Sequence, residues 1–297
     1  MKIKEYFEKK KTDIYKIIVL VLVVVLAVCV IILVKEYVDR KNAEDYYREL
    51  AKSINTGTEK NVNVEIPKDT QVVLETETES SQLVQNEPVG ENQIEIPEKN
   101  LDWNKIFAAN SDIYAWLYIP GTKIDYPIFQ SATDDEYYLN HNMDGSEGYP
   151  GCIYTEMAND KEFKSFNTVL YGHNMKNGTM FHSLHDYLKD EKYFEQNRYA
   201  YIYLPDGRKF AYEIFAAYVF TDQHLLNTFN YETEADREDY LKTVFSYDND
   251  SANFRKDVSV TGKNHILTMS TCITGKPNNR VIVQGVLVND SNLITDR

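Results

Sequence analysis

The sequence His265-Ile266-Leu267-Thr268-Met269-Ser270-Thr271-Cys272 is rich in β-branched and apolar residues and ends in a cysteine. After seven intervening residues, Arg280 opens a second run of this kind, Val281-Ile282-Val283-Gln284-Gly285-Val286-Leu287-Val288. Both runs predict β-strands. A cysteine at the end of one strand and an arginine at the start of the next can place a thiol beside a fixed positive charge. This pattern indicates an active site rather than a packed core.

A histidine follows an earlier strand-like run, in Val169-Leu170-Tyr171-Gly172-His173-Asn174-Met175. Gly172 permits a tight exit from the strand, and histidine can exchange a proton near neutral pH. Together, Cys272, His173 and Arg280 would supply the nucleophile, the proton carrier and the cation that acyl transfer through a thiol requires. The histidine and the cysteine are 99 positions apart, so their meeting in space is a prediction for the fold.

Strand-like runs follow one another through the C-terminal two thirds of the chain, with turn signals at Pro120-Gly121 and Asp206-Gly207. About eight or nine strands in one domain predict a mainly β fold, a closed or nearly closed antiparallel barrel. A short helix is expected after Asp102, and the amphipathic segment 233–247 is expected to be a helix inserted on the side of the barrel. The predicted strands are 115–119, 124–129, 151–155, 167–171, 199–204, 209–221, 258–260, 266–271 and 281–288.

The N-terminal third predicts a membrane anchor. Residues 17–34 form an uncharged apolar run of 18 residues, close to the roughly 20 that cross a bilayer as a helix. Six lysines within residues 1–16 predict a cytoplasmic N-terminus and an extracellular remainder, in a single-pass protein of the cell membrane. The alternative is a cleaved signal peptide, which the length of the run and the lack of a small-x-small cleavage site disfavour.

Residues 35–100 are expected to be a polar helix followed by a flexible stalk, since Thr, Glu, Asn and Gln leave too few large apolar side chains for a core. Aromatic and apolar density rises at Leu101, so 101–297 is the expected catalytic domain.

Composition also argues against several classes of function. A formal net charge of −14 disfavours nucleic acid as a partner. Only Cys152 and Cys272 lie beyond the apolar run, so no disulfide framework is expected, and Cys152 is interpreted as a small buried hydrophobe. His141, His182 and His185 lack the usual spacings of zinc ligands. We expect neither a metal nor a cofactor.

With these motifs the chain resembles the sortases, and in particular the class B sortases of Gram-positive bacteria. The resemblance rests on Thr268-Met269-Ser270-Thr271-Cys272, close to a Thr-Leu-x-Thr-Cys signature, on Arg280 in the next strand, and on 171–175. Similar pieces are 137–140, 148–154 and 177–181, and the likeness covers nearly all of 101–290. Met269 for the usual Leu and Asp135 for an apparent Asn are the departures.

The resemblance implies a closed eight-stranded sortase barrel with N-terminal helices and a helix between the sixth and seventh strands. It also implies a cysteine transpeptidase that needs no cofactor. Such enzymes cleave a C-terminal sorting signal (NPxTG or NPQTN-like) of a secreted protein after its Thr. They hold the acyl group on the cysteine and pass it to an amine of the cell-wall peptidoglycan precursor.

The resemblance also assigns roles to residues. Cys272 would be the nucleophile, His173 would protonate the leaving amine and deprotonate the incoming one, and Arg280 would hold the substrate backbone and oxyanion. The residues expected to line the peptide groove are Tyr171, Leu139, Ser270 and Thr271.

Three alternatives remain open. A pilus-polymerising sortase would use the same chemistry on another acceptor. A cell-wall cysteine peptidase of the papain-like sort normally places its thiol at the start of a helix and before its histidine, the reverse of the order here. A non-catalytic binding module tethered to the membrane would use Cys272 only for packing.

Overall fold

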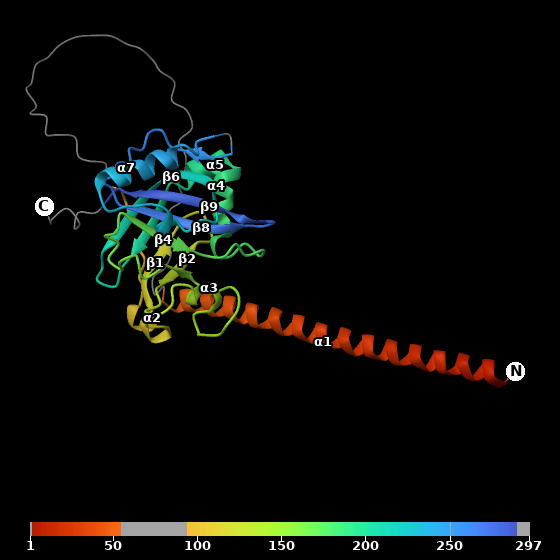
Figure 1. Cartoon of the computed structure of the whole chain (residues 1–297). Coiled ribbons are helices and arrows are strands. Elements are labelled where there is room, and N and C mark those ends of the chain that lie inside the picture. The colour runs from red at the N-terminus through yellow and green to blue at the C-terminus, as the bar shows by residue number, and fades with distance from the viewer. Residues whose placement is uncertain (1, 55–93, 250, 290–297) are drawn as a thin grey trace, which may run out of the picture.

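The computed structural model describes residues 2–54, 94–249 and 251–289. Nine strands form one sheet, and eight of them close into a barrel, which confirms the expected mainly β fold (Figure 1). The barrel strands are β1 (Ile113–Tyr118), β2 (Asp125–Phe129), β3 (Ile153–Tyr154), β4 (Asn167–Tyr171), β5 (Tyr199–Tyr203), β6 (Lys209–Thr221), β8 (Ile266–Ile273) and β9 (Lys276–Leu287). Their order is β5-β1-β2-β3-β4-β8-β9-β6, and β6 pairs back onto β5 to close the ring.

The expectation of a purely antiparallel barrel is wrong, because the sheet is mixed. Strands β2 and β3 pair in parallel, and so do β4 and β8. Parallel neighbours need long crossover connections, and the segment between β4 and β8 supplies one, since it contains β5, β6 and most of the helices.

The predicted strand at 258–260 is also absent from the structure. Val258 and Val260 pack against the apolar cluster beside β6 without joining a ladder. Instead, a two-residue strand, β7 (Asn253–Phe254), pairs with the middle of β6. Alternating apolar residues indicate which side chains are buried, but they do not reveal whether a partner strand lies alongside.

Two of the helices, α2 (Trp103–Ala109) and α7 (Glu234–Phe245), start where a capping side chain lies. Asp102 accepts a hydrogen bond from the Lys105 amide and caps α2, and Thr233 forms a capping box with Asp236 at the start of α7. Because α7 lies between β6 and β8, the sixth and seventh barrel strands, the expected inserted helix is confirmed. The shorter helices are α3 (Tyr137–Asn140), η1 (Phe181–His185), α4 (Asp186–Lys189), α5 (Glu191–Gln196) and α6 (Leu225–Thr228).

The N-terminal segment is one continuous helix, α1 (Lys2–Ile54), which extends away from the barrel (Figure 1). The apolar side chains of 17–34 are exposed along it, and the helix has the length and composition of a membrane anchor or a signal sequence. Its last turns differ, because Ala43, Tyr47 and Leu50 are buried against the barrel. The expected stalk falls mainly on 55–93, outside the described residues.

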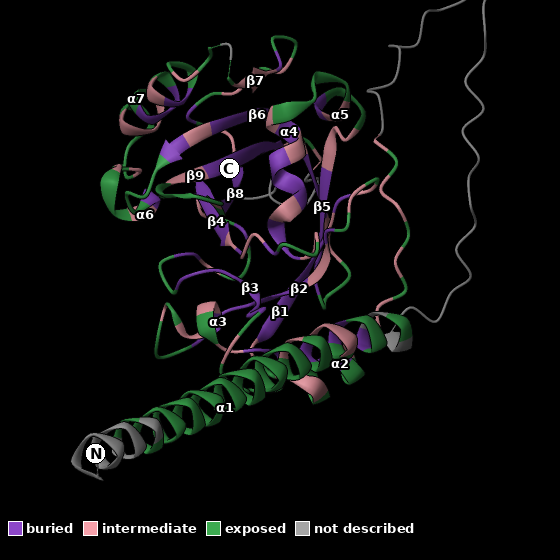
Figure 2. Ribbon diagram, turned by 90° about the vertical axis from the view of Figure 1, so that its right-hand side faces the viewer, coloured by how far each residue is buried: buried purple, intermediate pink, exposed green. Residues whose placement is uncertain are grey.

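The core has one part inside the barrel and two outside it. Side chains of the barrel strands fill the interior, while Trp116 and its neighbours face α1 and α2, and Tyr240, Leu241 and Val244 of α7 cover the outer face of β6 and β9. Figure 2 shows this burial along the strands and its absence over most of α1.

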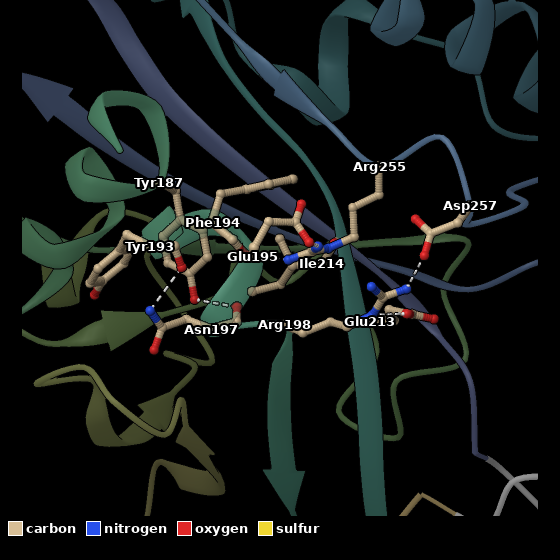
Figure 3. A network of polar contacts seen from close by, with 10 residues as sticks. All are labelled: Tyr187, Tyr193, Phe194, Glu195, Asn197, Arg198, Glu213, Ile214, Arg255 and Asp257. Atoms are coloured by element: carbon tan, nitrogen blue, oxygen red, sulfur yellow. Dashed lines mark hydrogen bonds and ion pairs between the residues drawn. The ribbon is translucent and has the colours of Figure 1, made fainter. Parts of the chain in front are cut away.

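A buried arginine, Arg255, links strand β6 to helix α5 (Figure 3). Arg255 is 3% exposed, and its Nε donates to the Ile214 carbonyl at 2.7 Å. Its other nitrogens bind Glu195 and the Phe194 carbonyl, so every arm of the guanidinium has a partner. Such full satisfaction is what allows a charge to be buried.

Candidate active site

The parallel pairing of β4 and β8 brings the predicted histidine and cysteine to the same edge of the barrel. Tyr171 lies opposite Ser270 in this ladder. His173 and Cys272 each follow two residues later. Because parallel strands run in the same direction, His173 and Cys272 lie at the same end of these two strands. The fold therefore brings two residues that are 99 positions apart in the sequence to the same end of the barrel.

Gly172 is required at this exit by a lack of space. A Cβ atom at this position would meet the side chain of Ile153 and lie 2.8 Å from Phe181 Cδ2. The Gly172 amide donates to the Ser270 carbonyl at 3.2 Å, and Thr271 Oγ1 donates to the Gly172 carbonyl at 2.7 Å. These two bonds fix the chain before His173 against the end of β8.

Arg280 is the direct cross-strand partner of Cys272 in the β8–β9 hairpin. Its Nη1 donates to the carbonyl oxygens of Pro277 (2.7 Å) and Asn279 (3.1 Å), which hold the guanidinium in the turn. Among the described residues, no carboxylate forms an ion pair with it. The thiol of Cys272 is exposed, and an unneutralised positive charge lies on the neighbouring strand.

All seven residues singled out from the sequence line one cleft of about 230 Å³. Leu139 lies in α3, Tyr171 ends β4, and Ser270 and Thr271 belong to β8. The remaining lining residues are Glu136, Tyr154, Glu156, Gly172, Phe220, Thr221, Asp222, Gln223, His224, Leu225 and Ile282. The structure thus places the predicted set together, while the role of each residue stays a prediction.

The imidazole of His173 is fixed by a backbone carbonyl. Its Nε2 lies 2.7 Å from the Leu139 carbonyl oxygen. Because that oxygen can only accept, Nε2 carries the proton, and the lone pair of the neutral ring is on Nδ1. Burial lowers the pKa of His173, and the hydrogen bond to Leu139 opposes this in part. A neutral ring with a free Nδ1 can accept a proton.

A second polar cluster holds the strand end that carries Cys272. Asn174 Nδ2 donates to the Cys272 carbonyl and to Thr274 Oγ1, both at 3.2 Å. Its Oδ1 lies 2.8 Å from His182 Nδ1, and its Nδ2 lies 3.3 Å from His185 Nε2. His182 and His185, two of the three histidines considered as zinc ligands, thus lie within hydrogen-bond distance of Asn174. Within the described ranges, no group of three or more His, Cys, Asp or Glu side chains is placed to hold a metal.

Sequence reasoning missed a carboxylate–imidazole pair that also lines the cleft. Glu156 Oε1 lies 2.8 Å from His224 Nε2, and the Glu156 side chain is 11% exposed. Burial raises the pKa of Glu156, while His224 opposes the rise. Burial and the charge on Glu156 raise the pKa of Tyr171. No local motif marks this pair, because its members are 68 positions apart and follow different strands.

The remaining outside cysteine is a core residue, as expected. Cys152 is 1% exposed, and burial raises its pKa far above the ordinary value. The hydroxyl of Tyr47 lies 2.9 Å from its sulfur. Asp135, the other position noted in the sequence, accepts a hydrogen bond from the Met157 amide at 2.6 Å.

Comparison with known proteins decides the family. A family model described as a sortase domain matches residues 117–288. Sortase B of Listeria monocytogenes is 40% identical over 182 residues, which are 60% of this chain and 71% of that protein. The chain belongs to the sortase B family. Sortase B of Staphylococcus aureus is 31% identical over 173 residues, covering 55% of this chain and 64% of that protein.

Solved structures of sortase B share the fold of this sortase. The Clostridium perfringens sortase B structure has a TM-score of 0.57 at 29% identity and covers 63% of this chain and 100% of that one. A Staphylococcus aureus sortase B structure has a TM-score of 0.56 at 27% identity, with 64% and 87% covered. Both the predicted family and the predicted barrel are therefore confirmed, and this sortase is a cysteine transpeptidase.

Proposed function

We propose that this sortase is anchored in the cell membrane and joins secreted proteins to the cell wall. It cleaves an NPxTG or NPQTN-like sorting signal after its Thr and transfers the new C-terminus to an amine of the peptidoglycan precursor. The observation that carries the proposal is the cleft in which Cys272, His173 and Arg280 lie on three adjoining chain segments.

The first half-reaction forms a thioester. As the sulfur of Cys272 attacks the carbonyl carbon of the substrate Thr, His173 Nδ1 accepts the thiol proton. The oxygen of the tetrahedral intermediate becomes negative, and the guanidinium of Arg280 lies on the strand beside Cys272 to stabilise it. The C–N bond then breaks, and His173 returns its proton to the leaving amine.

The second half-reaction repeats these steps in reverse order. The acceptor amine attacks the thioester carbon and gives a proton to His173. The C–S bond breaks, a new amide forms, and the sulfur recovers its proton from His173. Each turnover exchanges one amide for another, and no external base or metal is required by this balance.

The position of the enzyme follows from the N-terminal helix. With the six lysines of 1–16 inside, the barrel lies on the outer face of the membrane. Secreted proteins carrying a sorting signal and precursor amines would meet there.

The alternatives differ in their acceptors. A pilus-polymerising enzyme would prefer a lysine side chain of another protein, and a peptidase would use water. A Staphylococcus aureus sortase B–substrate complex shares this fold, which supports substrate binding by this chain.

Peptide transfer tests the proposal. The purified full chain in detergent is incubated with peptides that carry an NPQTN motif, an NPxTG motif or the same residues in scrambled order, together with a glycyl amine. We expect a new amide between Thr and the added glycine with a peptide that carries a motif, and none with the scrambled peptide. If the peptide is hydrolysed and an excess of the glycyl amine does not replace water as the acceptor, the result would support a peptidase instead. If neither motif is cleaved, the proposed sorting signal is contradicted.

A further inference from the structure

The last turns of α1 contact two loops that flank His173. The Tyr47 hydroxyl lies 2.8 Å from the Gly151 carbonyl oxygen, in the segment that leads into β3. Glu44 accepts a hydrogen bond from Asn177, in the loop that follows His173. Tyr47 is 8% exposed, so this contact is part of the packed structure.

A third contact links α1 to the histidine through one aromatic ring. The guanidinium carbon of Arg40 lies 5.5 Å from the ring centroid of Tyr149. The same Tyr149 ring lies 4.9 Å from the ring of His173, tilted by 59°. His173 is thus fixed at Nε2 by the Leu139 carbonyl and covered by an aromatic ring that the anchor helix contacts.

We propose that Tyr149 is a positioning residue for His173 and that the part of α1 from Arg40 to Tyr47 holds it in place. The inference rests on the proposed role of His173 in proton transfer. It assigns a catalytic consequence to the segment that joins the membrane span to the barrel.

The chain geometry makes this coupling direct. Arg40 is six residues beyond Val34, the last residue of the apolar run, or about 9 Å along a helix that rises 1.5 Å per residue. The span and the contact with Tyr149 belong to one uninterrupted helix. The loop that covers His173 is therefore held close to the membrane surface.

Removing the Tyr149 ring should change both the rate and the titration of His173. The ring helps to bury the imidazole, and burial lowers the pKa of His173. In Tyr149→Ala the imidazole would be more hydrated, and its pKa would rise toward the ordinary value. The charged and titratable groups that share the cleft with His173 are unchanged in that variant: Cys272, Arg280, Glu136, Glu156, Asp222, His224, Tyr154 and Tyr171.

The first experiment measures peptide transfer by the full chain in detergent. Tyr149→Ala should lower kcat about threefold to tenfold, which is the size of effect expected from the loss of an aromatic pair. It should also move the acid limb of the pH profile to higher pH. Tyr149→Phe keeps the ring and should match the wild type. Arg40→Ala should lower kcat about twofold to fivefold, while Arg48→Ala, which removes an exposed cation paired with Asp45 on the same helix, should not.

The second experiment does not depend on transpeptidase activity. The ring proton of His173 is titrated by NMR in the full chain, with His173→Gln for assignment, and thermal unfolding verifies that each variant is folded. A higher His173 pKa in Tyr149→Ala but not in Tyr149→Phe supports the inference. An unchanged pKa and an unchanged kcat in folded Tyr149→Ala would overturn it, and if that variant does not fold, Tyr149→Leu is judged by the same two results.

Discussion

At the scale of single residues, the decisive feature is the positive charge of Arg280 beside Cys272. Arg280 is held by the carbonyls of Pro277 and Asn279 and forms no ion pair with any described carboxylate. With Nη1 donating to these two carbonyls, the Nε and Nη2 donors would serve a substrate oxygen. The planar fork of an arginine offers paired hydrogen bonds that a lysine cannot reproduce.

Replacing Arg280 should therefore damage the chemical step. We expect Arg280→Gln to lower kcat about a hundredfold or more, as the loss of an oxyanion donor does, and Arg280→Lys to restore only part of it. Lys276→Gln is the matched control, because Lys276 is an exposed cation in the same hairpin. Steady-state kinetics with a motif peptide would measure both, and near-normal kcat in Arg280→Gln would exclude the assigned role.

The protonation of His173 gives a second prediction at this scale. Burial disfavours the imidazolium, so the pKa of His173 lies below its ordinary value of 6.5. The neutral ring, which would accept the thiol proton, then persists to lower pH. We expect the acid limb of kcat/KM to fall below pH 6.5, and a limb above that value would contradict the assignment.

At the scale of elements, sequence patterns predicted most strands but not how they pair. Runs such as 167–171 and 209–221 match β4 and β6, because their burial depends on local alternation. The parallel pairing of β4 with β8 depends on where the chain returns after a long crossover, which no local pattern encodes. The same reason hides the Glu156–His224 pair, whereas His173 and Cys272 were found from motifs within single segments.

A polar network beneath α7 supports the strands that carry the site. Thr268 Oγ1 donates to Asn167 Oδ1 at 2.6 Å and accepts from Gln284 Nε2 at 2.7 Å. It joins β4, β8 and β9 at buried positions. Hydrogen bonds between β4, β8 and β9 thus stabilise the strands that lead to His173 and Cys272.

Removing this hydroxyl should weaken the fold. Thr268→Val keeps the shape but removes one hydrogen bond from each of two buried groups, Asn167 Oδ1 and Gln284 Nε2, of which the second keeps the Tyr240 hydroxyl. The loss should reduce the free energy of unfolding by about 1–3 kcal/mol. Thr243→Val, at a half-buried position of α7 where the hydroxyl donates to the Asp239 carbonyl of the same helix, should change it little. Urea denaturation measures both, and equal stability of the two variants would show that the network contributes nothing.

At the scale of the whole molecule, α1 joins a predicted membrane span directly to the barrel. The sequence indicated the span, but not that the following turns pack on the domain. Ala43, Tyr47 and Leu50 stand among polar residues in the sequence, so no apolar run predicts their burial. They are buried because distant strands form the surface on which they pack.

The orientation can be measured on intact cells that express the full chain. The charged thiol reagent MTSET, which is found in complex with Staphylococcus aureus sortase B, does not cross membranes. We expect it to label Cys272 from outside without permeabilisation. Cys152 is buried and should stay unlabelled, and labelling of Cys272 that requires permeabilised cells would reverse the proposed topology.

The proposed mechanism requires a covalent bond between Cys272 and the substrate. The most direct measurement is intact-mass spectrometry of the full chain after mixing with a sorting-motif peptide in the absence of an acceptor amine. We predict an adduct with the mass of the peptide portion ending in Thr, located on Cys272, released by hydroxylamine and absent from Cys272→Ala. Transfer of the peptide to a glycyl amine by Cys272→Ala at the wild-type rate would contradict the account.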